Sequence, residues 1–170
     1  MSTETSPNSI PYRDAKDVGA ADFYFAINAT FRFIQTTLGP ESLHRYWREL
    51  GASYFAPVSA AWRCGGLAAI GSYWRAFFRA EPGADARVST APDRVTIEVL
   101  TCPAFNHLRA QGREIVPCFC QHCYHVSEAI AAPAGFTVRV QGGNGSCIQH
   151  FMPRGRDVSA QDLGQIKEAT

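Results

Sequence analysis

The sequence predicts an α+β fold, with helices packed on one face of an antiparallel sheet made of two hairpins. Apolar residues recur at helical spacing through the first half of the chain, and beyond residue 85 the pattern changes to the alternation typical of β-strands. The 170 residues contain no internal repeat, and their length suits one domain with its own core. We therefore expect a mobile N-terminal tail over residues 1–17, a single domain over 18–155 and a polar C-terminal tail over 156–170.

Three helices are expected in the first half, over about residues 20–38, 41–55 and 60–79. The first helix is apolar on more than one side, which is typical of a helix enclosed in a core or at a dimer interface. Gly39 ends this helix, and Pro40 suits the first turn of the next one. The all-round apolar helix is one reason to expect a homodimer.

The second half is expected to contain two hairpins and two helices. In "VTIEV", valine and isoleucine alternate with threonine and glutamate, as in a half-buried strand, and "GGNG" supplies a turn for the last hairpin. The expected ranges are 86–103 for the first hairpin, 102–112 for a short helix, 118–131 for a cysteine-rich helix and 136–152 for the second hairpin.

Composition excludes several functional classes. The formal net charge is +1 and the arginines are scattered, so the chain lacks the basic stripe that nucleic-acid binding requires. No apolar run approaches the roughly 20 residues that span a bilayer, and no secretory signal is recognisable. We therefore expect a cytoplasmic protein without nucleic-acid or membrane partners. In that reducing compartment, the six cysteines are expected to be thiols, metal ligands or nucleophiles rather than disulfides.

The stretch "PCFCQHCYHVSEAI" holds three cysteines and two histidines within nine positions. Plotted at about 100° per residue, an α-helix here separates them onto three faces, so the cysteines form one cluster only if the first turn is irregular. The first face carries Phe119, Cys123, Val126 and Ile130, the second Cys118, His122, His125 and Ala129, and the third Cys120, Tyr124 and Ser127.

Two interpretations of this helix remain open. Cys118, His122 and His125 could together hold a transition metal such as zinc or iron, although nothing in the sequence requires a cofactor. The simpler interpretation is structural: Cys123 packs in the core as a small apolar residue, and the histidines lie on a solvated face.

Two further cysteines lie on neighbouring elements. Cys102 stands where a strand ends and a helix begins, and the positive end of a helix dipole lowers a thiol pKa, so it is a candidate nucleophile. Cys147 follows the glycine-rich turn, and strand alternation places it with Gln149 on one face and Ile148 with His150 on the other.

The motifs "CPAFNHLRAQG", "CFCQHC" and "FTVRVQGGNGSCIQHF", within residues 25–151, resemble the L-2-amino-thiazoline-4-carboxylic acid hydrolase-like family. The resemblance implies a fold shared with 4-vinyl reductase domains and transport-particle subunits, which are commonly dimeric and hold a small molecule. The resemblance implies that Cys102 and Cys147 correspond to two of the family's cysteines. The family's middle cysteine could be Cys118, Cys120 or Cys123. Zinc-binding relatives carry a glutamate and a second cysteine ahead of the last cysteine, and "FTVRVQGGNGS" has neither.

Two functional hypotheses follow. The first is a hydrolase that opens the C=N or C–S bond of a small heterocycle, with a thiolate as nucleophile and a histidine to move protons. The second is a non-catalytic sensor or carrier that binds a small molecule or metal. The expected catalytic residues are Cys102, Cys123, His122 and His125, and the expected ligand-binding residues are Cys120, Cys147 and Glu98.

Overall fold

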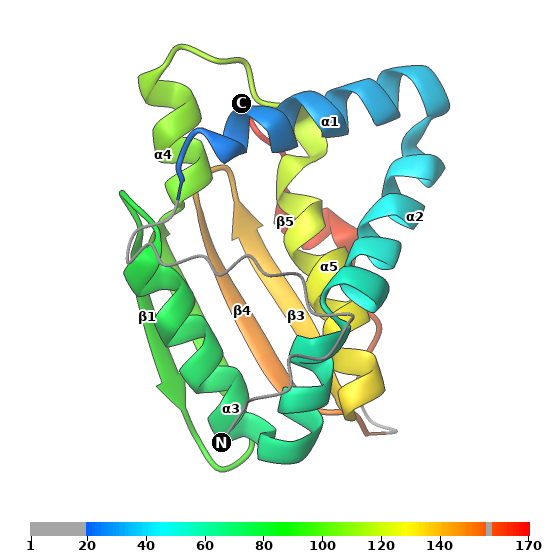
Figure 1. Ribbon diagram of the computed structural model, residues 1–170, viewed down its shortest axis with the longest axis vertical. Helices are drawn as coiled ribbons and strands as arrows, with labels where there is room; N and C mark the ends of the chain where they lie inside the picture. Colours follow the sequence, from blue (N-terminus) through cyan, green and yellow to red (C-terminus); the bar gives the residue numbers. More distant parts are fainter. Residues whose placement is uncertain (1–19, 156–157) are drawn as a thin grey trace, which may run out of the picture.

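The computed structural model describes residues 20–155 and 158–170, and it shows an α+β domain with helices on one face of a five-stranded sheet (Figure 1). The expected mobile tail over residues 1–17 lies outside the described residues. The helices are α1 Phe23–Leu38, α2 Pro40–Glu49, α3 Ala56–Ala80, α4 Pro103–Ala110 and α5 Gln121–Ala131. The strands are β1 Asp85–Thr90, β2 Val95–Thr101, β3 Phe136–Gly143, β4 Ser146–Pro153 and β5 Ile166–Lys167.

The sheet has the order β1-β2-β4-β3-β5, and the first four strands pair antiparallel as the two expected hairpins. The fifth strand corrects the sequence prediction, because it runs parallel to β3 and makes the sheet mixed. It lies in the segment expected to be a polar tail, yet Ile166 is only 4% exposed and packs in the core. A two-residue strand is too short to show any alternation in the sequence.

The helices divide the interior into two parts. α3 and α5 cover the sheet and enclose the larger core, whereas α1, α2 and α4 enclose a second core at one end of the sheet (Figure 1). The opposite face of the sheet is more open, since Leu100 and Ile148 there are 40% and 37% exposed. None of the described helices is long and apolar enough to cross a membrane.

The region between α2 and α3 differs in detail from the expected single break at Pro57. α2 passes into a π-helical turn over Leu50–Tyr54, and α3 then begins at Ala56 with Pro57 in its first turn, where a missing N–H costs nothing. This turn places Gly51 directly against α5. A Cβ at Gly51 would lie 2.5 Å from the Val126 carbonyl oxygen and 2.7 Å from the Ala129 Cβ.

Gly51→Ala should therefore destabilise the protein, because a Cβ cannot fit between the π-helical turn and α5. We expect the free energy of unfolding to fall by about 1–3 kcal/mol, measured by urea denaturation. Gly155→Ala is the matched control, since no atom of a non-adjacent described residue lies within 4 Å of the Cβ position there. A gain in stability of the kind that helical Gly→Ala changes usually give would contradict this close contact.

Candidate functional site

Four of the six cysteines gather at one end of the sheet, where the two cores meet. They come from four places in the chain: the residue before α4, the 3₁₀ turn before α5, the first turn of α5 and the start of β4. We call Cys102, Cys120, Cys123 and Cys147 the thiol cluster, because the charge of Cys123 raises the pKa of each of the other three.

The β3–β4 turn connects the members of this cluster. The backbone N–H of Cys102 donates to the Gly145 carbonyl at 2.8 Å, and the backbone N–H of Asn144 donates to the Cys120 Sγ at 3.3 Å. Cys147 follows directly on this turn and pairs with Gly142 and Val99 across the sheet. One tight turn therefore brings thiols from α4, the 3₁₀ turn and β4 together.

An irregular first turn explains why helical spacing misassigned the cysteines. Pro117–Cys120 is 3₁₀ helix, and regular α-helix begins only at Gln121. Cys120 was expected to stand apart from Cys123. The two lie close enough, however, for the charge of a Cys123 thiolate to raise the pKa of Cys120, as it raises those of Cys102 and Cys147. Cys118 is buried in the second core, and none of these thiols is among the charges that shift its pKa.

Burial controls the chemistry of the thiol cluster. It is the main cause that raises the pKa of Cys102 to about 11 and those of Cys120 and Cys123 to about 12, and it also raises the pKa of Cys147. The expected low pKa of Cys102 at the start of α4 is therefore wrong in this arrangement. The N–H groups of Phe105 and Ala104 do lower the pKa of Cys102, but burial outweighs them. All four thiols are protonated at neutral pH.

His122 is the imidazole nearest to the thiol cluster. Its Nδ1 lies 2.5 Å from the Phe119 carbonyl oxygen, which can only accept, so the proton of the neutral ring is on Nδ1 and Nε2 carries a free lone pair. The Cys123 Sγ is 3.7 Å from Nε2 and 4.0 Å from Nδ1. Burial lowers the pKa of His122 and raises that of Cys123, so both groups are neutral, and transfer of the thiol proton to Nε2 is unfavourable in this arrangement.

His125 is not part of this cluster, although it was expected to be catalytic. Its ring stacks on His44 and Trp47 of α2, with centroid separations of 4.5 and 5.6 Å. It is 7% exposed, and its Nε2 has no hydrogen-bond partner among the described residues. Burial, followed by the charges of His44, Arg48 and His122, lowers its pKa to about 4.

The expected metal site of Cys118, His122 and His125 is not assembled. In the described part of the chain, no three His, Cys, Asp or Glu side chains are placed to hold a metal ion. The two histidines point toward α1 and α2, where His122 contacts Phe31, while Cys118 lies in the 3₁₀ turn that precedes α5. These donor groups do not fit a metal in this arrangement.

Glu98 also lies away from the thiols. Its side chain is on the open face of the sheet, 3.8 Å from the Arg87 guanidinium, because it alternates with the buried Ile97 and Val99. A different carboxylate, Glu81, accepts a hydrogen bond of 2.5 Å from the hydroxyl of Tyr24, whose pKa is also shifted by two of the thiols. Burial and this carboxylate raise the pKa of Tyr24, and the charges of Cys102 and Cys123 act in the same direction.

Sequence reasoning did not assign a role to Tyr24, Glu81 or Gln149. Gln149 was placed correctly on the face of Cys147, and its Nε2 lies 3.6 Å from that sulfur, while its Oε1 is buried without a partner among the described residues. A polar amide on the buried face of a central strand was the available signal. Tyr24 and Glu81 are 57 residues apart, and no sequence pattern links them.

Comparisons with models of protein families, with curated proteins and with solved structures found no match to this chain. The site is therefore interpreted from its own geometry.

Alkylation of the native protein should separate the cysteines into two classes. Cys64 is exposed and should react with iodoacetamide first, whereas the thiol cluster should react at least about 100-fold more slowly at pH 7.5, since its members are partly buried and their raised pKa values keep them neutral. Peptide mass spectrometry against time provides the rates. Equal rates at Cys64 and Cys123 would contradict the buried cluster.

The lowered pKa of His125 makes stability depend on pH. In the unfolded chain this imidazole binds a proton near pH 6.5, but in the folded protein only near pH 4, so stability is lost as the pH falls between these values. His125→Phe keeps the ring stack and should reduce that loss by about 1–2 kcal/mol in urea denaturation at pH 4.5 compared with pH 7.5. A pH dependence identical to that of the unaltered protein would contradict the assignment.

Proposed function

We propose that the thiol cluster is a small-molecule site at which the protein opens the C=N or C–S bond of a small heterocycle by hydrolysis. The observation that carries this proposal is the convergence of four thiols, one of which, Cys123, lies 3.7 Å from the free Nε2 of His122. Core packing alone does not require thiols from separate elements to lie together around one turn. The motifs that resemble the thiazoline-carboxylate hydrolase-like family support the same reaction class.

Cys123 is the proposed nucleophile, because its Sγ is the sulfur within reach of His122. Its proton passes to Nε2 as Sγ bonds to the ring carbon, and the electron pair of the C=N bond moves to nitrogen, which takes the proton from the imidazolium. The ring C–S bond then breaks as the nitrogen lone pair re-forms a C=N bond, and the ring sulfur leaves as a thiolate that takes the proton from that nitrogen. Water adds across the C=N bond, with its hydroxyl on the carbon and its other proton on the nitrogen. The C–Sγ bond breaks as the hydroxyl oxygen forms C=O, and the hydroxyl proton returns to Sγ.

The neighbouring groups have supporting roles in this proposal. Cys102 lies at the start of α4, where the N–H groups of Ala104 and Phe105 favour negative charge. Tyr24 stays protonated and, held by Glu81, offers a hydroxyl beside the cluster. Cys120 and Cys147 are the residues proposed to contact the bound ring.

Ligand binding must rearrange this site before any reaction. The Cys123 Sγ is almost equally far from both nitrogens of His122, so it is not aligned with the Nε2 lone pair. The raised thiol pKa values favour the second candidate, a protein that binds a small molecule without turning it over. The two candidates differ in whether bound ligand yields product.

Replacement of the nucleophile should distinguish them. We expect Cys123→Ser to lower turnover of 2-aminothiazoline-4-carboxylate and related thiazolines at least about 100-fold, measured by chromatography of the products, with the fold retained. Cys64→Ser is the matched control, because Cys64 is exposed and far from the cluster in sequence. A thermal shift with the thiazolines in the unaltered protein but no product would instead establish the binding protein.

A further inference from the structure

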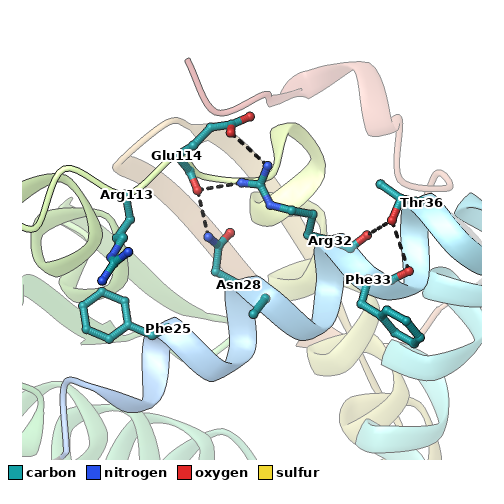
Figure 2. Close-up of a pocket in the computed structure, with 8 residues that line it drawn as sticks. Phe25, Asn28, Arg32, Phe33, Thr36, Arg113 and Glu114 are labelled. Carbon is teal, nitrogen blue, oxygen red and sulfur yellow. Dashed lines mark hydrogen bonds and ion pairs between the residues drawn. The ribbon is translucent and has the colours of Figure 1, made fainter.

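A groove of about 630 Å³ runs along the solvent side of α1 and is separate from the thiol cluster (Figure 2). One wall is the face of α1 from Phe25 to Thr36, and the other is the chain segment that follows α4, at Arg113 and Glu114. None of the six cysteines lines this groove. Its volume lies within the range of about 300–1,000 Å³ that is usual for small-molecule sites.

The two walls are fixed to each other by polar contacts of buried Asn28. This side chain is 7% exposed, and its Nδ2 donates to the Glu114 carbonyl at 2.9 Å while its Oδ1 accepts the Val116 N–H at 3.0 Å. The Arg32 Nη2 donates to the same Glu114 carbonyl at 2.8 Å (Figure 2). The groove is therefore formed before any ligand arrives, which reduces the entropy cost of binding.

The charges along the groove do not balance. Arg32 and Glu114 form an ion pair of 3.0 Å, so they neutralise each other. Arg113 lies with its guanidinium 5.2 Å above the ring of Phe25 and makes no ion pair with any described residue. One end of the groove thus presents a positive charge, and toward the other end Phe33 is 62% exposed.

We propose that this groove binds a small aromatic carboxylate. The carboxylate pairs with the guanidinium of Arg113, which can donate two parallel hydrogen bonds, and the ring packs against Phe33. Eight residues of helix separate Phe25 from Phe33, or about 12 Å along α1, which suits a bicyclic ring with its carboxylate better than a single ring. This site is independent of the thiol chemistry proposed above.

Calorimetric titration of the full chain with 2-naphthoate tests this site, with 2-naphthamide as the uncharged analogue of the same shape. We expect 2-naphthoate to bind at least about fivefold more tightly than the amide, and Arg113→Gln to remove that difference. Phe33→Ala should weaken both compounds. Arg45→Gln on α2 is the matched control and should change neither, because Arg45 is exposed and lies outside the groove.

Glu114→Gln should change the affinity for 2-naphthoate in the opposite direction to Arg113→Gln. It removes a negative charge from the groove and releases Arg32 from its ion pair, so it should strengthen binding of 2-naphthoate and leave 2-naphthamide unchanged. Equal affinity for the two compounds, or an unchanged affinity in Arg113→Gln, would overturn the proposal. So would binding that disappears as the protein concentration is raised, since that would show that a second copy of the chain covers the groove.

Discussion

The enclosure of α5 on two sides is the constraint on which the rest of the structure depends. The sheet packs against one side, and the π-helical turn at Gly51 approaches the other so closely that no side chain fits between. Because α5 cannot shift, the 3₁₀ turn before it holds Cys120 at the β3–β4 turn, and the first helical turn holds Cys123 and His122. The β3–β4 turn also accepts the N–H of Cys102, through the Gly145 carbonyl. The end of the sheet and the start of α5 therefore form one unit.

Desolvation is the physical effect that then determines the character of the site. Removal of water raises the pKa of each thiol and lowers that of His122, so the cluster rests as neutral thiols beside a neutral imidazole. At Cys102 the N–H groups at the start of α4 favour the thiolate, but burial outweighs them. A ligand that lets water or its own polar groups reach the cluster would shift this balance toward thiolate, and the proposed reaction depends on that change.

Hydrophobic periodicity was sufficient to predict the α+β class and the two hairpins, because half-buried strands and helices impose different spacings on apolar residues. The alternation of Cys147 and Gln149 with Ile148 was confirmed for the same reason. Helical spacing placed His122 and His125 on one face, and both rings contact Trp47 of α2, but regular spacing does not extend to Cys118 and Cys120, which lie in a 3₁₀ turn. Contacts that depend on tertiary packing, such as Tyr24 with Glu81 or His125 with His44, leave no periodic signal in the sequence.

A crystal structure with sulfur positions located by anomalous scattering is the most direct test of the thiol cluster. The geometry described above predicts four sulfur peaks gathered beneath the start of α5 at the β3–β4 turn, from Cys102, Cys120, Cys123 and Cys147. The peak of Cys64 should lie apart at the surface. A regular α-helix that begins at Cys118 and turns Cys120 away from Cys123 would contradict the cluster and the function proposed for it.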